Sequence, residues 1–230
     1  MKLAIITGTS QGLGKALFDQ LIVKNIFVIS ISRRFSDKQL ELQKEKKCLL
    51  IRLDLKRVTN KILENKFLSV SKNIKKTQIY YFNNAFVLSP TGLIGNLDEN
   101  ELRTAIQINI ISSVLLVNFI LQTFKAHHLH LVNISSGAAK RAIIGWPIYC
   151  STKSANEMFF DVLKQQSSNN PKIKVFNIRP GVINTNMQKQ IRSLPKNKFP
   201  FVNTFKEYHK TGKLASSSDV AKRILKEIKI

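Results

Sequence analysis

Three side chains in one stretch of the sequence have the types and spacing that proton transfer requires. Ser136 precedes Tyr149 by thirteen residues, and Lys153 follows Tyr149 by four. If the segment after Tyr149 is helical, its phenol and the Lys153 ammonium share one face, because residues four apart lie above one another. The pKa of a free phenol is about 10, and a fixed cation beside it moves that pKa toward neutrality, where a proton donor works best. The stretch therefore predicts a proton donor, a cation that tunes it, and a hydroxyl able to hold a substrate oxygen.

A tyrosine and a lysine also fall four apart by chance in many surface helices, so the surrounding elements have to decide. The apolar run at residues 130–134 ends just before Ser136 and predicts a strand, while residues 156–166 continue an amphipathic helix. Ligands of open α/β sheets bind at the carboxyl ends of the strands. This position favours a functional role for Ser136, Tyr149 and Lys153.

A glycine-rich turn follows the first apolar run of the chain. Residues 3–6 predict a strand, and residues 15–22 have helical periodicity. Between them, Gly8 permits a tight turn, Gly12 lets the backbone approach a pyrophosphate, and Gly14 lets the helix pack closely. The spacing is G-x-x-x-G-x-G, and an ordinary helix entry is the alternative. The strand, turn and helix context favours a dinucleotide site.

The second predicted strand, residues 26–32, ends in a way that bears on the choice of dinucleotide. An acidic residue at this point binds the ribose 2′-hydroxyl of NAD, whereas arginine accommodates the 2′-phosphate of NADP. This chain has Ser32 followed by Arg33 and Arg34. The pattern favours NADP, and the alternative is two solvated charges in a basic protein.

Other polar residues follow predicted strands or interrupt apolar segments. Asp54 ends the strand at 48–54, where it could bind an adenine amino group or cap a helix that starts near Val58. Asn83 and Asn84 follow the strand at 78–82 and could tie loops together or line a cleft. Asn109 lies inside an apolar helix, where asparagine is unfavourable, and is therefore either a satisfied buried group or a functional one. A sixth strand is predicted at 173–178.

Strands alternate with helices along the whole chain, with no internal repeat or linker. This order predicts an α/β protein, a three-layer Rossmann fold with a doubly wound parallel sheet and helices on both faces. A length of 230 residues with 43% hydrophobic residues suits a single domain spanning 1–230. Residues 192–213 are basic, contain aromatic residues and read as an irregular substrate-covering lid.

Composition bears on location and partners. The net charge of +23 is compatible with nucleic-acid binding, but the lysines are spread over nearly every element and no recognition motif accompanies them, so a compositional bias is favoured. Cys48 and Cys150 are too few for a disulfide framework or a metal site, which points to a reducing cytoplasm. Polar residues interrupt the apolar stretch 106–124, which predicts a buried helix rather than a membrane span.

Together these motifs resemble the short-chain dehydrogenase/reductase superfamily over nearly the whole chain. The matching residues are Thr7-Gly8-x-x-x-Gly12-x-Gly14, Asp54-Leu55, Asn83-Asn84-Ala85, Asn109, Ser136, Tyr149-x-x-x-Lys153 and Pro180-Gly181-x-x-x-Thr185. Residues 145–153 and 180–188 look like the bacterial benzil reductases that form (S)-benzoin, which are relatives of sepiapterin reductase.

This resemblance implies a role for each matching residue. Tyr149 is expected to be the general acid, Lys153 to lower its pKa and hold the nicotinamide ribose, Ser136 to polarise the substrate carbonyl, and Asn109 to support a proton-relaying water. Besides Tyr149 and Lys153, the expected NADP(H) contacts are Gly8, Ser10, Gly12, Leu13, Arg33, Asp54, Leu55, Asn83, Val182 and Thr185. Trp146 and Met187, with Ser136 and Tyr149, are expected to contact an apolar substrate. No metal is needed, and a homodimer or homotetramer is expected.

Two features depart from the family pattern. The family usually has glycine at the position of Phe86, so the active-site geometry is expected to differ there. The chain ends at Ile230, so the seventh strand of relatives is expected to be missing. The resulting hypothesis is an NADPH-dependent carbonyl reductase acting on ketones or vicinal diketones. A catalytically silent NADP-binding sensor and a pterin reductase are the alternatives.

Overall fold

The computed structural model of the protein describes residues 2–73 and 78–230. In this part of the chain a single parallel sheet has the strand order β3-β2-β1-β4-β5-β6. The strands are β1 (Lys2–Thr7), β2 (Phe27–Ser32), β3 (Cys48–Arg52), β4 (Gln78–Asn83), β5 (His128–Ile134) and β6 (Ile173–Ile178). The order reverses direction between β1 and β4, which creates a crevice at the carboxyl ends of these central strands.

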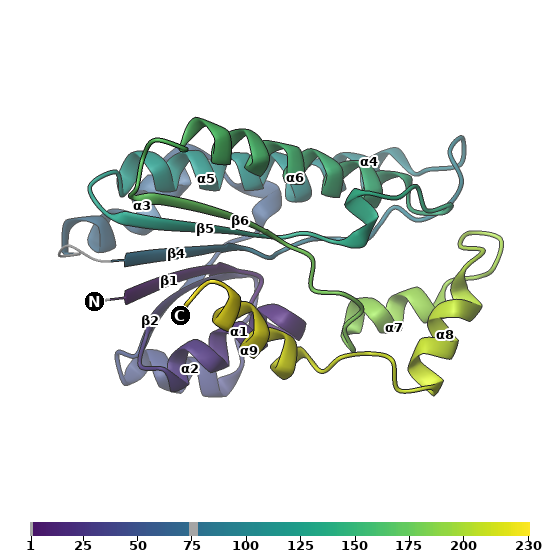
Figure 1. Cartoon of the computed structure of the whole chain (residues 1–230), viewed down its shortest axis with the longest axis horizontal. Coiled ribbons are helices and arrows are strands. Elements are labelled where there is room, and N and C mark those ends of the chain that lie inside the picture. Colours follow the sequence, from purple (N-terminus) through teal and green to yellow (C-terminus); the bar gives the residue numbers. More distant parts are fainter. Residues whose placement is uncertain (1, 74–77) are drawn as a thin grey trace.

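The strands are parallel and buried because their sequences are apolar on both faces. In the central register, Ile5 of β1 pairs with Ile29 of β2 and with Tyr81 of β4. Figure 1 shows the sheet crossing the molecule between two layers of helices. The three-layer, doubly wound fold predicted from the sequence is confirmed.

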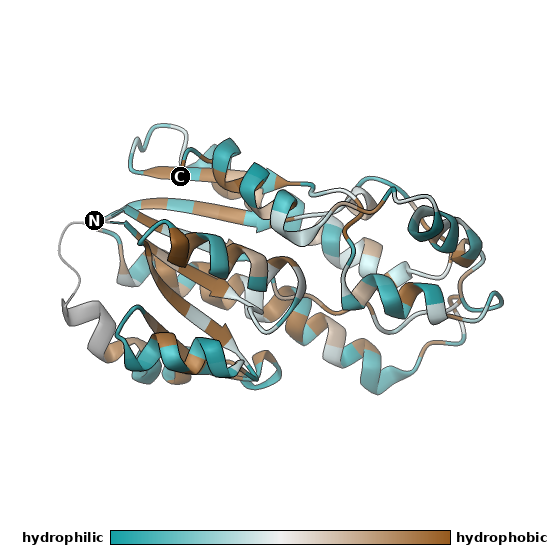
Figure 2. Ribbon diagram, turned by 90° about the horizontal axis from the view of Figure 1, so that it is seen from below, coloured by the Kyte–Doolittle hydropathy of each residue, from teal (hydrophilic) through white to brown (hydrophobic). Residues whose placement is uncertain are grey.

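Each face of the sheet has its own hydrophobic core. One face packs against α3 (Asn60–Asn73), α5 (Ser112–Thr123) and α6 (Pro147–Gln166), with Phe67 and Phe160 among the buried side chains. The other face packs against α1 (Gly12–Val23) and α9 (Ser217–Glu227), next to which lies α2 (Asp37–Lys44). Figure 2 shows the hydrophobic strands inside and hydrophilic residues on the outer sides of the helices.

The helix that precedes α5 is less regular than its apolar sequence predicts. After α4 (Glu99–Ile106), residues Gln107–Ile111 form a turn of π-helix, a rare conformation that often marks a functional site. Within the described residues, the run Glu99–Thr123 is long and apolar enough to cross a membrane, and 50% of its most apolar window is buried inside the protein. That burial agrees with the predicted core helix.

The region predicted as an irregular lid is partly helical. It contains the end of α7 (Asn186–Ser193) and all of α8 (Val202–Lys210), which lie beyond the carboxyl ends of the strands in Figure 1. The indole of Trp146 stacks on Phe199, with ring centroids 4.6 Å apart, and Phe205 packs against both rings. These three rings form a small aromatic core that packs residues 192–213 against Trp146 at the start of α6. The aromatic residues of this region are evident from the sequence, but their contact with Trp146 is not.

Candidate active site

A cavity of about 420 Å³ lies where the strands β1 to β6 end, between the sheet edge and the α7–α8 segment. Most residues that the sequence identified line it. They are Gly8, Ser10, Gly12, Leu13, Arg33, Asp54, Leu55, Ser136, Trp146, Tyr149, Lys153, Val182, Thr185 and Met187. We call this cavity the cleft.

Tyr149 lies in the first turns of α6, which places its phenol against the loop that follows β5. The side chain is 8% exposed and lies next to the hydroxyl of Ser136, which favours the phenolate and so tends to lower the pKa of Tyr149. Burial raises the pKa of Tyr149 to about 12, and the Ser136 hydroxyl opposes that rise only in part. The phenol therefore keeps its proton at neutral pH, and a lowering of its pKa by Lys153 stays a prediction.

Lys153 is one helical turn further along α6 and is also buried, with 3% exposure. Its Nζ donates to the backbone carbonyl of Ile134, 2.7 Å away, and lies 5.8 Å from the centroid of the Tyr149 ring. Burial lowers the pKa of Lys153 to about 7, and the negative charge of Glu157 opposes that change. The ammonium is thus fixed beside the phenol but is only marginally charged at neutral pH.

Phe86 occupies the position where the family usually has glycine. Its ring centroid is 3.5 Å from Nζ of Lys153, and the ring meets that of Tyr149 edge to face at 5.9 Å. Phe86 itself lines the cleft. The local geometry therefore differs as expected, because the Phe86 ring packs against the Lys153 ammonium.

The glycine turn fits the phosphates of a dinucleotide. A Cβ on Gly14 would lie 2.1 Å from the carbonyl oxygen of Gly8, so only glycine allows α1 to begin this close to β1. Gly8 has φ +75°, a conformation that side chains disfavour. The first residue before α1, Gln11, gives no side-chain cap, and no acidic residue lies in the first turn. The amino end of α1 therefore offers uncapped backbone N–H groups to an anion.

Arg33 and Asp54 lie at the ends of their strands as expected. Arg33 is exposed at the end of β2 and lines the cleft. Asp54 also lines the cleft, and its carboxylate accepts a 3.0 Å bond from the N–H of Lys56 in the 3-10 turn η1 (Leu55–Arg57). Asp54 therefore caps η1 and not the following helix, α3, which begins at Asn60, while its contact with an adenine amino group stays a prediction.

Two predicted site residues do not line the cleft. The amide of Asn83 donates to Asn133 of β5 and to Asn156 of α6, whereas the neighbouring Asn84 lines the cleft and donates to the carbonyls of Thr7 and Gly8. Of the two roles left open for this pair, Asn83 therefore ties buried elements together and Asn84 reaches the cleft.

Asn109 lies in the π-helical turn and acts on the loop after β4. Its amide accepts from Val87 N–H at 2.9 Å and donates to the Val87 carbonyl at 3.0 Å and to the Thr152 hydroxyl at 3.2 Å. The Asn109 carbonyl accepts a bond from Asn156. Its side chain thus fixes the segment that carries Phe86, rather than facing the cleft.

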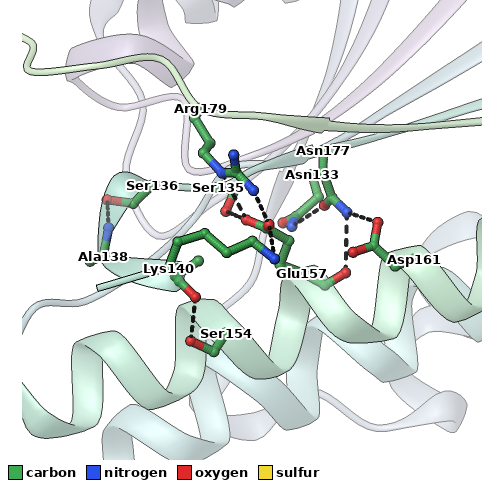
Figure 3. A network of polar contacts seen from close by, with 11 residues as sticks. Asn133, Ser135, Ser136, Ala138, Lys140, Ser154, Glu157, Asp161, Asn177 and Arg179 are labelled. Atoms are coloured by element: carbon green, nitrogen blue, oxygen red, sulfur yellow. Dashed lines mark hydrogen bonds and ion pairs between the residues drawn. The ribbon is translucent and has the colours of Figure 1, made fainter. Parts of the chain in front are cut away.

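Sequence reasoning missed a buried carboxylate next to this site. Glu157 lies one turn beyond Lys153 on α6 and binds Ser135, Lys140 and Arg179, as Figure 3 shows. The signal in the sequence is an acid four residues after the lysine, on the helix face that must be buried if Tyr149 and Lys153 are. Among the described residues, no group of three or more His, Cys, Asp or Glu side chains could hold a metal ion.

Comparison with known proteins agrees with this geometry. The family of short chain dehydrogenases matches residues 2–196. The benzil reductase ((S)-benzoin forming) of Bacillus cereus is 36% identical over 232 residues, which cover 97% of this chain and 92% of that protein. The chain belongs to the short-chain dehydrogenases.

Solved structures of other proteins share the fold. The KRED1-Pglu enzyme has a TM-score of 0.85 at 26% identity, over 96% of this chain and 92% of that one. The structure of ElxO with NADP bound has a TM-score of 0.79 at 24% identity, over 97% of this chain and 90% of that one. This short-chain dehydrogenase therefore shares the Rossmann-like framework of these proteins.

Proposed function

We propose that the protein is an NADPH-dependent carbonyl reductase that acts on ketones or vicinal diketones with apolar substituents. The observation that carries this proposal is the buried Tyr149 phenol, which lines the same cleft as Ser136 and the Lys153 ammonium. A buried acid beside a buried cation suits the protonation of an oxygen that gains negative charge.

The side chains divide the chemistry among themselves. A reduced nicotinamide, when bound, supplies hydride to the carbonyl carbon. The Ser136 hydroxyl holds the substrate oxygen, and Tyr149 donates its proton to that oxygen. The phenolate that remains is stabilised by the Lys153 ammonium, which the Ile134 carbonyl holds in place. The burial of both side chains excludes water and strengthens these interactions.

The choice of NADP(H) is supported by the residues at the end of β2. Ser32 provides no carboxylate for a 2′-hydroxyl, and Arg33 lines the cleft where a 2′-phosphate would lie. The uncapped amino end of α1 suits the pyrophosphate. The similar fold of ElxO, solved with NADP bound, agrees with this choice.

Apolar residues that line the cleft near Tyr149 support the proposed substrate class. Trp146, Met187, Ile191 and Phe205 form an apolar surface beside Tyr149. Such a wall favours an apolar or aromatic group next to the reacting carbonyl. Two similar proteins, from Bacillus cereus and Bacillus subtilis, are benzil reductases, and their activity fits this description.

The proposal is tested by following NADPH oxidation with benzil and with simple aliphatic diketones. The parent protein should turn over at least one of them, and Tyr149→Phe should lose at least about a hundredfold in kcat. Tyr80→Phe is the matched control. Tyr80 lies on β4, does not line the cleft, and donates its hydroxyl proton to Gln78. A Tyr149→Phe variant as active as the parent would end the assignment.

One observation favours a second candidate, a nucleotide sensor without turnover. The Phe86 ring covers the ammonium that a nicotinamide ribose would have to reach. Calorimetric titration with NADPH, run beside the activity assay, separates the two functions, because a sensor binds the nucleotide and leaves every carbonyl substrate unchanged.

A further inference from the structure

Glu157 joins three segments of the chain that meet beside the cleft. Its carboxylate accepts a hydrogen bond of 2.5 Å from the Ser135 hydroxyl and forms an ion pair with Lys140 at 3.0 Å. Both partners lie in the loop after β5. Arg179, at the end of β6, binds the same carboxylate through two nitrogens. Figure 3 shows all three donors converging on Glu157 from above α6.

The carboxylate is buried although its cations are not. The Glu157 side chain is 3% exposed, whereas those of Lys140 and Arg179 are 56% and 47% exposed. Burying a carboxylate is unfavourable unless its partners compensate. An ion pair on the surface could hold the same loops without the cost of burying a carboxylate. The buried position of the Glu157 carboxylate on α6 therefore needs a further reason.

That reason lies in the two neighbours of Glu157 that belong to the candidate active site. Ser135 directly precedes Ser136, so a bond to Ser135 fixes the backbone that presents the Ser136 hydroxyl. Lys153 is one helical turn before Glu157 and also faces the protein interior. Neither Glu157 nor Arg179 lines the cleft, so any effect on chemistry passes through these neighbours.

The charges around Lys153 make Glu157 its electrostatic partner. Burial disfavours the ammonium, and the charge that counters it is the carboxylate of Glu157. The other groups facing Glu157 are the cations Lys140 and Arg179, while Asp161 lies a turn further on and bonds to Asn177. The rings of Phe86 and Tyr149 also lie near Lys153, with centroids 3.5 Å and 5.8 Å from its Nζ.

We propose that Glu157 is a positioning residue for the reaction: it fixes the loop that carries Ser136 and places a negative charge one helical turn from the Lys153 ammonium. This role deepens the proposed carbonyl reduction and rests on it. Glu157 touches neither substrate nor cofactor and acts through Ser135 and Lys153.

The test is the pH dependence of kcat/KM for Glu157→Gln. Without the carboxylate, the Lys153 ammonium loses its proton at lower pH, so the alkaline fall in activity should move down by about one pH unit. At pH values above the fall, kcat/KM of Glu157→Gln should then be about tenfold lower than that of the parent, because one pH unit corresponds to a factor of ten. At pH values below the fall, the two proteins should differ little. A substitution that only loosened the loops would lower activity by the same factor at every pH.

Two further variants separate charge from structure. Asp161→Asn removes the same charge one turn further along α6 and should leave the alkaline fall where it is. Arg179→Gln loosens the same network but removes a positive charge, so the fall should stay or move to higher pH, opposite to Glu157→Gln. Arg179 is half exposed, so this variant also guards against a Glu157→Gln protein that does not fold.

The titration of the Lys153 side chain by NMR, assigned through its absence in Lys153→Met, gives a readout that does not depend on turnover. A lower Lys153 pKa in Glu157→Gln, or a higher one in Arg179→Gln, supports the coupling. An unchanged Lys153 titration in both variants overturns it. A parent protein that reduces no carbonyl compound contradicts the proposed function instead, and the NMR titration still decides the coupling.

Discussion

Burial acts on Tyr149 and Lys153 in opposite directions. It raises the pKa of the phenol to about 12 and lowers that of the ammonium to about 7, so both side chains are biased toward their neutral forms. In the proposed reaction, Tyr149 keeps its proton until it meets an oxygen with developing negative charge. The phenolate and the ammonium would then stabilise each other in a buried site.

Arg33 is predicted to select the phosphorylated dinucleotide. Arg33→Gln should weaken NADPH binding about tenfold, because one charge-assisted contact to the 2′-phosphate is lost, and should leave NADH binding unchanged. Arg34→Gln is the control, since Arg34 is equally exposed but does not line the cleft. Calorimetric titrations measure both affinities. Equal losses for NADPH and NADH would mean that Arg33 contributes only general positive charge.

Phe86 is predicted to oppose nucleotide binding. A ribose that engages Lys153 has to displace the ring from Nζ, which gives up a cation–π contact of about 1 kcal/mol. Phe86→Ala should therefore bind NADPH up to about fivefold more tightly. Phe35→Ala, which alters a half-buried phenylalanine outside the cleft, serves as the control. Weaker binding by Phe86→Ala would show that the ring supports the nucleotide.

Among the elements, the π-helical turn connects the fold to the site. It brings Asn109 into a position where one amide satisfies both backbone groups of Val87. The loop after β4 is thereby held against α6 through Thr152. The position of Phe86, one residue earlier, follows from this attachment.

The Asn109 amide is therefore predicted to contribute to stability. Asn109→Ala should lower the free energy of unfolding by about 2–3 kcal/mol, because the Val87 N–H and C=O lose their partner. Asn118→Ala, at an exposed position of α5, should change it by less than about 0.5 kcal/mol. Urea unfolding measures both. Equal small effects would show that water replaces the amide.

The strands and most helices could be predicted because their apolar runs and turn residues are local signals. The boundaries of β6 agree with the sequence, and the catalytic spacing of Tyr149 and Lys153 depends only on α6 being helical. The π turn, the α8 helix and the Glu157 network could not be predicted. Each depends on contacts between distant segments, such as Glu157 with Arg179 or Trp146 with Phe199.

At the scale of the whole molecule, electrostatics is dominated by a net charge of +23. Such a field attracts anionic nucleotides, and it also opposes the compact state. Glu157 is one of only 14 acidic residues, and its three donors lower its pKa to about 2. One of the few negative charges of the protein is therefore buried next to the cations Lys140 and Arg179, one helical turn from Lys153.

Glu157 is predicted to link stability to acid pH. Its folded pKa lies below the ordinary value of 4.5, so its contribution is present above that value and is lost as pH falls from 4.5 toward 2. Between pH 6 and pH 3 the parent should lose about 2 kcal/mol more stability than Glu157→Gln. Urea unfolding at the two pH values measures the difference. Equal losses would show that the carboxylate is not held in its charged form by the fold.

The whole arrangement of fold, cleft and side chains is tested by tracing hydride and proton transfer together. NADPH carrying deuterium at the transferred position of the nicotinamide is incubated with benzil, and the product is analysed by mass spectrometry. The parent should place deuterium on the carbinol carbon, while Tyr149→Phe, at NADPH concentrations that saturate it, should form at most about a hundredth of the labelled product. Product without deuterium, or equal labelling by Tyr149→Phe, would contradict hydride transfer with Tyr149 as the acid.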